Sequence, residues 1–134
     1  MAKLTKVEGI GETQAQKLID AGIMTAEALL ERGKTPQGRQ AMADETGISG
    51  TLILDWVNRV DLFRVKGIGE EYSDLLEAAG VDTVPELAQR NPENLHQKLM
   101  EVNEEKELVR RPPSQKEVNR WVEQAKGLPR AIEY

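Results

Sequence analysis

Three short glycine turns are the parts of this chain best suited to chemistry, which would be anion binding by backbone amides. Two read Gly-Ile-Gly, at residues 9–11 and 67–69, and the third is Gly47-Ile48-Ser49. Glycine permits turns that are closed to bulky side chains. The first amides of a helix that follows such a turn point outward and can hold a phosphate oxygen. The residues that we expect to contact phosphate are Gly9, Gly11, Gly67, Gly69, Gly47, Ile48 and Ser49.

Acidic residues follow two of the three turns. Glu12 comes after the first Gly-Ile-Gly, and Glu70-Glu71 come after the second. Carboxylates at a helix N-terminus stabilise the helix but repel an incoming phosphate. The turn at residues 47–49 has no acid directly after it and is therefore the better candidate. The alternative, that both Gly-Ile-Gly turns only allow two helices to cross, remains open.

Two basic clusters could assist. Arg110, Arg111, Lys116 and Arg120 surround a Pro-Pro turn, and a smaller cluster is formed by Arg32, Lys34 and Arg39. Each could meet a phosphate backbone or an acidic protein surface. Each could equally be a solvated face that pairs with neighbouring carboxylates.

Residues for other chemistry are sparse. The chain has no cysteine, and its one histidine, His96, lies in a polar segment with no second imidazole to complete a metal site or triad, so we expect it on an exposed helix face. Gly33-Lys34-Thr35 resembles the end of a phosphate-binding loop, but Ala28 stands where that loop needs glycine. We expect no catalytic residue, no metal and no cofactor.

Composition favours a cytoplasmic protein and allows only a local contact with nucleic acid. The 134 residues carry a formal charge of −5, which counts against tight, general binding to nucleic acid. The lack of cysteine fits a reducing compartment, and no apolar run approaches the length of a membrane span. The sequence does not indicate an oligomeric state.

The turns belong to a repeat. Leu4–Leu29 returns 58 residues later as Leu62–Leu87, with 11 identical residues in 26 aligned positions. The identities are mostly glycines and apolar residues at helical spacing, so the repeat preserves backbone geometry and a buried face. We therefore divide the chain into units at residues 1–61 and 62–134.

Capping residues and apolar spacing predict helices throughout and no strand. Helices should follow the Gly-Ile-Gly turns and begin again at Thr25, Thr83, Thr35-Pro36 and Asn91-Pro92. The last helix of each unit repeats with an offset of 65, so that Ser49 and Trp56 correspond to Ser114 and Trp121. Both tryptophans lie on apolar stripes and are expected in the core, where they would hold the halves together. The seven extra residues of the second unit should lie at residues 103–109, as an extended helix or an exposed loop.

The turn, its preceding apolar residue and the helix after it resemble the helix-hairpin-helix motif. With Gly47–Ser49 as a second hairpin, the first unit is similar to the paired helix-hairpin-helix domains of recombinases and nucleotide-excision nucleases. At the fourth hairpin Arg110-Arg111-Pro112-Pro113-Ser114 replaces the glycine turn, which makes it degenerate. The whole chain from Leu4 also resembles an uncharacterised bacterial family that pairs two such units. In DNA-binding helix-hairpin-helix proteins a lysine or arginine commonly follows the glycine turn, whereas this chain has Glu12 and Glu70.

These observations together predict an all-α fold with two tandem, pseudo-symmetric, SAM-like helical units packed into one compact body. The expected function is a non-catalytic module that contacts nucleic-acid backbone weakly, chiefly at Gly47–Ser49 with help from Arg110 and Arg111. The alternative is a protein-interaction or scaffolding module that kept the fold and lost the phosphate site. The partner is then an unidentified protein instead of nucleic acid.

Overall fold

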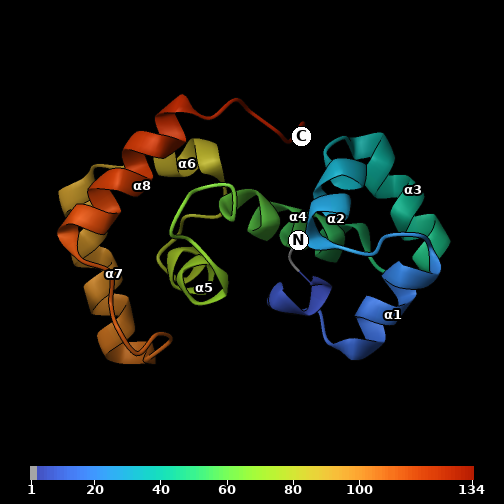
Figure 1. Ribbon diagram of the computed structural model, residues 1–134, viewed down its shortest axis with the longest axis horizontal. Coiled ribbons are helices and arrows are strands. Elements are labelled where there is room, and N and C mark those ends of the chain that lie inside the picture. The colour runs from blue at the N-terminus through green and yellow to red at the C-terminus, as the bar shows by residue number, and fades with distance from the viewer. Residues whose placement is uncertain (1–2) are drawn as a thin grey trace. The chain divides into compact units, whose positions relative to one another are not determined.

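A computed structural model describes residues 3–134 of the chain (Figure 1). A short 3-10 helix, η1 (Leu4–Lys6), comes first, and no strand occurs among the described residues. The prediction of an all-α fold is confirmed. The α-helices are α1 (Glu12–Asp20), α2 (Ala26–Gly33), α3 (Pro36–Thr46), α4 (Gly50–Leu62), α5 (Glu70–Ala78), α6 (Val84–Gln89), α7 (Pro92–Lys106) and α8 (Gln115–Gly127).

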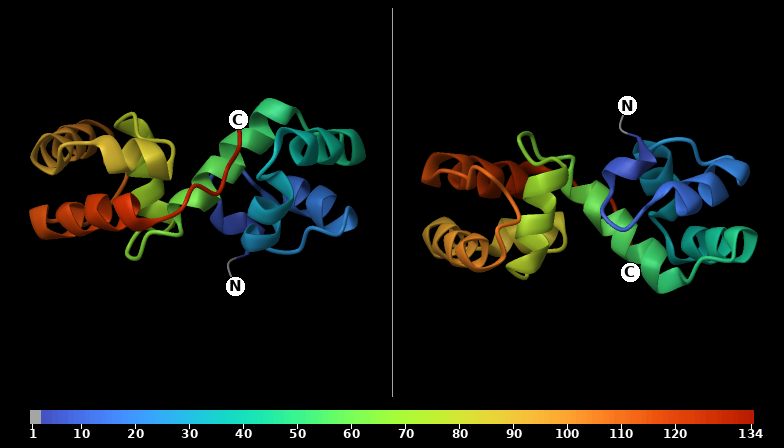
Figure 2. Two further views of the ribbon diagram at one scale, coloured as in Figure 1. Left: turned by 90° about the horizontal axis from the view of Figure 1, so that it is seen from above. Right: turned by 90° about the horizontal axis from the view of Figure 1, so that it is seen from below.

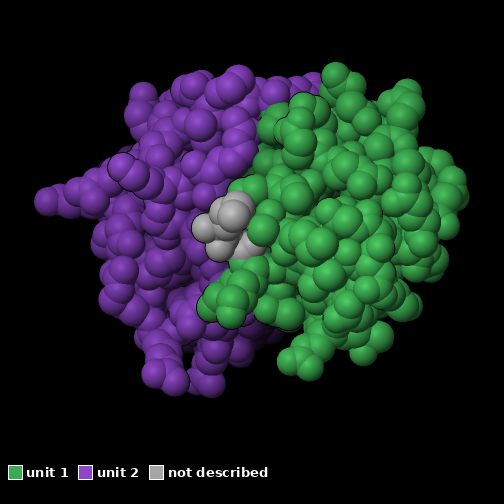
Figure 3. Space-filling model, turned by 45° about the vertical axis from the view of Figure 1, so that its right-hand side comes forward, with its two compact units in different colours: residues 1–61, 131–134 green, residues 62–130 purple. Residues whose placement is uncertain are grey.

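The helices form two compact units, coloured separately in Figure 3. One contains the residues up to Asp61 together with Ala131–Tyr134, and the other contains Leu62–Arg130. The division falls where the repeat begins again. The last four residues, which sequence analysis assigned to the second unit, pack with the first.

Within the first unit, η1 packs on α1, and α2 packs on α3. Within the second, α8 lies along both α6 and α7, and α5 packs on α7, as two further views also show (Figure 2). The second unit has one apolar core, which includes Leu76, Leu95, Val118 and Trp121. Burial of these side chains provides the main driving force for folding the unit.

Side-chain caps begin most of the helices, as predicted. The hydroxyl groups of Thr25 and Thr35 accept backbone N–H groups at 3.1 and 3.0 Å, and the Asn91 side chain accepts one at 2.9 Å. Thr83 and Ser114 cap α6 and α8 in the same way, each at 3.2 Å. Each cap satisfies an amide that the helix itself leaves without a partner, a contribution of about 1 kcal/mol.

The inserted residues of the second unit are part helix and part loop. The helix α7 runs to Lys106, and Glu107 then reverses the chain with a left-handed backbone (φ 50°). The buried Asn103 side chain holds the returning segment in place. Its amide donates to the Val109 carbonyl (3.1 Å), and its oxygen accepts the Val109 N–H (2.9 Å). One asparagine therefore closes the loop.

Both tryptophans are core residues. Trp56 and Trp121 are each 2% exposed, which confirms their predicted burial. Trp121 also packs on Tyr72, with the ring centroids 5.1 Å apart. The indole nitrogens lie beside Gly9 and Gly67, so each tryptophan supports the glycine turn of its own unit.

His96 differs from its predicted exposed position. It is half-buried, and its Nε2–H donates to the Pro113 carbonyl at 3.1 Å. The ring faces the Pro-Pro turn because residues 112–113 return alongside α7 after the inserted loop. As for membranes, none of the helices in the part of the chain described combines the length and apolarity that a crossing requires.

Candidate functional site

The two Gly-Ile-Gly turns have the same backbone hydrogen bonds. The Ile10 N–H donates to the Val7 carbonyl and the Ile68 N–H donates to the Val65 carbonyl, both at 3.1 Å. The first glycine of each turn is left-handed, with φ of 92° at Gly9 and 95° at Gly67. The isoleucines are buried, so each turn presents backbone on its outer side.

The first glycine of each turn is required by the fold. Its left-handed backbone is strained for any residue with a Cβ. A Cβ on Gly9 or Gly67 would also lie 3.0 Å from the indole nitrogen of Trp56 or Trp121. Backbone conformation and packing therefore both select glycine here, without any ligand.

The second glycine is not required in this way. Gly11 has φ −83° and ψ −177°, and Gly69 has φ −115° and ψ −155°, both in the extended range. Among the described residues, a Cβ at either position would meet no atom within 4 Å. The fold alone would accept a side chain at Gly11 and Gly69.

These two glycines also stand at the ends of helices. Gly11 is the N-cap of α1 and Gly69 is the N-cap of α5, and neither residue makes a side-chain cap bond to its helix. The other helix starts with a recorded cap use Ser, Thr or Asn. The N-cap residues of α1 and α5 therefore do not themselves occupy the first-turn amides, which carry the partial positive charge of the helix end.

The carboxylates expected next to these turns are present and exposed. Glu12 lies in the first turn of α1, and Glu70 and Glu71 lie in the first turn of α5. They offset the positive end of each helix dipole. The same charges weaken the attraction of the turns for phosphate.

The third turn is satisfied by its own residues. Gly47 ends α3 in a left-handed conformation (φ 73°), and the buried Ile48 donates its N–H to Thr46 Oγ1 at 3.2 Å. The Ser49 hydroxyl accepts the Leu52 N–H at 3.2 Å and so caps α4. Each of the three residues has a structural task, and its phosphate contact stays a prediction.

Residues 110–117, where the sequence predicts a degenerate fourth hairpin, hold an internal ion pair. Arg111 donates to both oxygens of Glu117, at 2.8 and 3.1 Å, and its carbonyl accepts the Tyr72 hydroxyl at 2.8 Å. The Glu117 carboxylate also accepts the Ser114 N–H at 3.1 Å, which completes a capping box. Arg111 and this amide lower the pKa of Glu117 to about 2. The groups of Arg111 and Ser114 that could meet a phosphate are thus engaged by Glu117.

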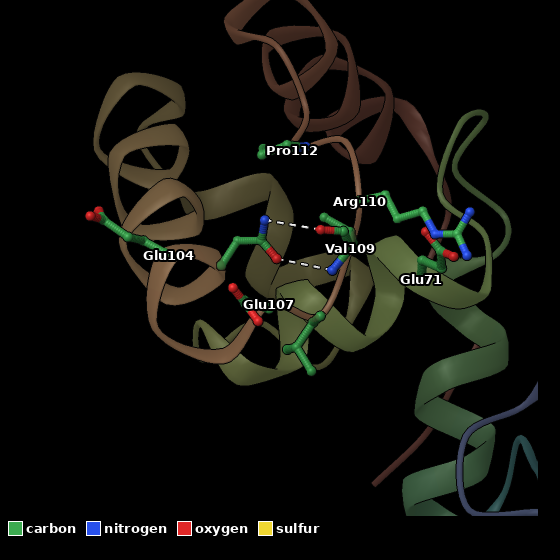
Figure 4. A pocket seen from close by; sticks show the side chains of 8 residues that line it. Glu71, Glu104, Glu107, Val109, Arg110 and Pro112 are labelled. Carbon is green, nitrogen blue, oxygen red and sulfur yellow. Dashed lines mark hydrogen bonds between the residues drawn. The ribbon is translucent and has the colours of Figure 1, made fainter.

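Arg110 lines a pocket of about 640 Å³ in the second unit (Figure 4). Three carboxylates, those of Glu71, Glu104 and Glu107, line it as well. Glu71 lies on the Arg110 side of the pocket and Glu104 on the opposite side. This charge balance disfavours phosphate. Lys116 lies exposed in the first turn of α8.

The second basic cluster is used by the fold. Arg32 pairs with Glu45 at 3.3 Å and Lys34 pairs with Glu31 at 2.8 Å. Arg39 is buried, and its guanidinium donates to the carbonyls of Gly33 and Glu133, both at 2.8 Å. Sequence analysis missed this role, because an arginine between polar residues gives no signal of burial.

Metal-binding geometry is not found in the described part of the chain, where no three His, Asp or Glu side chains are grouped so as to hold an ion. No curated protein and no solved structure matches this chain. A family match covers residues 8–128 and therefore nearly the whole repeat. The chain belongs to the family described as a domain of unknown function (DUF4332).

Proposed function

We propose that this chain is a non-catalytic module whose Gly-Ile-Gly turns are helix-hairpin-helix hairpins that contact nucleic-acid backbone weakly and without sequence preference. One observation carries the proposal. Gly11 and Gly69 are glycines at uncapped helix N-termini, although neither their backbone angles nor their surroundings exclude a side chain. A missing side chain at such a position lets a phosphate oxygen approach the first amides of the helix.

In this proposal the turns at Gly11 and Gly69 are the main phosphate contacts, in place of the turn at Gly47–Ser49. Ser49 caps α4 with its own hydroxyl, and Arg111 is held by Glu117. Gly11 and Gly69 are N-cap residues that make no side-chain bond of this kind to their own helices. The turn at Gly47–Ser49 and the side chains of Arg110 and Lys116 would then make weaker, additional contacts to the nucleic-acid backbone.

Affinity should be low. The net charge of −5 and the carboxylates of Glu12, Glu70 and Glu71 oppose association. Non-specific binding typically has a Kd of about 10⁻⁴–10⁻⁶ M at physiological salt. We expect the weak end of that range, with affinity falling as salt rises. The absence of cysteine fits the reducing cytoplasm, which we propose as the compartment.

The test is fluorescence anisotropy of labelled double-stranded, single-stranded and branched DNA and of RNA, at low and at physiological salt. The decisive variant is G11D/G69D. Aspartate is a favourable N-cap, so the helices should keep their stability, while the new carboxylates occupy the amides and repel phosphate. The matched control is T25D/T35D, which adds the same charge at two N-caps outside the turns.

Loss of salt-sensitive binding in G11D/G69D but not in T25D/T35D is the expected result. Equal losses would indicate only a general effect of charge and would contradict a site at the turns. Absence of binding to every probe at about 100 µM protein, the weak limit of ordinary non-specific binding, would reject nucleic acid as the partner.

The rival function is protein interaction or scaffolding. The acidic first turns at Glu12 and Glu70 favour it, because a surface of this sign suits a basic protein better than a phosphate. It predicts no nucleic-acid affinity and a specific protein partner that co-purifies with the chain. The anisotropy titration separates the two functions.

A further inference from the structure

The last residues of the chain are bound to the first unit like an extended peptide ligand. The Glu133 N–H donates to the Lys34 carbonyl at 2.7 Å, and the Glu133 carbonyl accepts from Arg39 at 2.8 Å. Ile132 is 2% exposed, and the Tyr134 hydroxyl donates to Asn58 Oδ1 at 2.8 Å. Backbone bonds on both sides of one residue, with flanking side chains anchored, are typical of peptide recognition.

The receiving surface is built around a buried charge. Arg39 is 7% exposed and donates through Nη1 to the Gly33 carbonyl and through Nη2 to the Glu133 carbonyl. A buried guanidinium that loses an acceptor carries a large desolvation cost. We name the surface formed by Lys34, Arg39 and Asn58 the tail groove. The Arg39 guanidinium in it keeps both of its hydrogen bonds when an extended segment lies there.

We infer that the tail groove is a docking site for an extended Ile-Glu-Tyr segment, and that residues 131–134 of a second copy of this chain can occupy it. The hydrogen bonds from the tail to Lys34, Arg39 and Asn58 are made with residues of the first unit and would be the same if the tail came from another molecule. Exchange of identical elements between copies is a low-cost route to association. This inference does not depend on the proposed nucleic-acid function.

The connection to the tail allows such exchange. Residues 128–130 have no regular structure between the end of α8 and the tail, and Pro129 and Arg130 are exposed. A recorded anchor of this stretch is the bond from Arg64 Nη2 to the Pro129 carbonyl, at 2.7 Å. A tail on the same chain has an effective concentration of about millimolar for a short linker. In the native protein, exchange should therefore become visible only at high protein concentration.

Two complementary variants test the inference at lower concentration. I132D places a charge at the buried anchor, which releases the tail and leaves the groove vacant. R39A removes the guanidinium, which disables the groove and leaves the tail intact. Each variant alone should sediment as a monomer, and an equimolar mixture should form a one-to-one heterodimer, because one copy supplies the tail and the other supplies the groove.

The control for the mixture is I132D with R39A/E133P. Proline at residue 133 has no N–H for the Lys34 carbonyl, so the donated tail loses a backbone bond and the heterodimer should dissociate. Circular dichroism establishes that each variant is folded. Mixtures that stay monomeric at about 1 mM, the effective concentration expected for the tail, would overturn the inference. So would variants that associate equally well alone.

A peptide measurement keeps the inference testable if R39A does not fold. A labelled peptide, Leu-Pro-Arg-Ala-Ile-Glu-Tyr, is titrated into I132D and followed by anisotropy. Saturable binding that falls about tenfold or more when the peptide isoleucine becomes aspartate is expected, because its burial and the bonds beside it are lost. Equal binding of the two peptides would contradict a groove that selects this segment.

Discussion

The N-termini of α4 and α8 correspond in the sequence repeat, Ser49 to Ser114, but their caps differ. Each begins after a serine whose hydroxyl accepts an amide three residues on, Ser49 from Leu52 and Ser114 from Glu117, both at 3.2 Å. In α8 the Glu117 carboxylate returns the bond to the Ser114 N–H and binds Arg111. In α4 the same position is Leu52, which is 41% exposed and has no charge.

The difference lies in the residue three positions after the serine. The serine supports the helix in both units, whereas the residue three positions later decides whether an anion already sits at the helix end. At α8 the anion is part of the chain, so an arginine that looks available in the sequence is held by it. At α4 the position of the carboxylate is taken by a leucine, and the Ser49 hydroxyl accepts the Leu52 N–H.

Truncation of the tryptophans should have the largest effect on stability. It tests the buried indole that α4 and α8 have in common. W56A and W121A each remove a buried indole that packs against Gly9 or Gly67, and each should cost about 3–5 kcal/mol of unfolding free energy. Denaturant titration followed by circular dichroism measures it, and the remaining tryptophan reports on the other unit by fluorescence. A loss below about 1 kcal/mol, too small for a buried aromatic side chain, would contradict a core role.

Neutralising Glu117 should have a smaller, pH-dependent effect confined to α8. The folded-state pKa of Glu117 is about 2, below its ordinary 4.5, so the carboxylate adds stability above pH 4.5 and loses it as pH falls toward 2. Because Arg111 is largely exposed, solvent screening keeps this contribution small.

Unfolding free energies of the native protein and E117Q, measured from pH 7 to 2.5, test this prediction. The difference should be constant above about pH 5 and should shrink below it. A difference that is independent of pH would mean that the charge of Glu117 is not what stabilises α8.

Transfer of the capping box to α4 should have the smallest effect. L52E creates the Ser-x-x-Glu pattern that α8 has, and L52A is the reference because both variants lose the leucine contacts. We expect L52E to be more stable than L52A by about 0.5 kcal/mol in urea titration. Equal stabilities would show that Glu117 depends on Arg111 and not on the capping box.

The same pair of variants sharpens the nucleic-acid proposal. If the turn at Gly47–Ser49 carries phosphate contact, L52E should weaken anisotropy binding relative to L52A. If the turns at Gly11 and Gly69 carry it, the two variants should bind alike. G11D/G69D then remains the variant that abolishes binding.

Much of the fold was predictable because it depends on local rules. Threonine, asparagine and serine caps begin helices wherever they precede helical residues, and apolar spacing placed Trp56 and Trp121 in the core. For residues 103–109 the sequence left an extended helix and an exposed loop as alternatives, and the structure has helix to Lys106 and a loop from Glu107. A left-handed glutamate depends on what holds the returning chain, here Asn103, which no local pattern indicates.

The glycine turns could be located from the sequence, but the different requirements of their glycines could not. The glycine spacing identified both turns, yet the four glycines look alike in sequence. The structure separates Gly9 and Gly67, selected by φ and by tryptophan, from Gly11 and Gly69, which are not. In the sequence Arg111 could likewise be free for a ligand or paired with a carboxylate, and in the structure it is paired with Glu117.

The sequence by itself determined the helical class, the repeat, the helix starts and the buried faces, because each depends on residues within a few positions of one another. Tertiary structure alone decided which charged side chains are engaged in internal bonds and where residues 131–134 pack. Arg39 is buried because Glu133, 94 residues later, supplies a carbonyl to it, and residues 131–134 join the first unit for the same reason. Contacts between distant residues follow from the packing of whole units, which no local pattern of residues encodes.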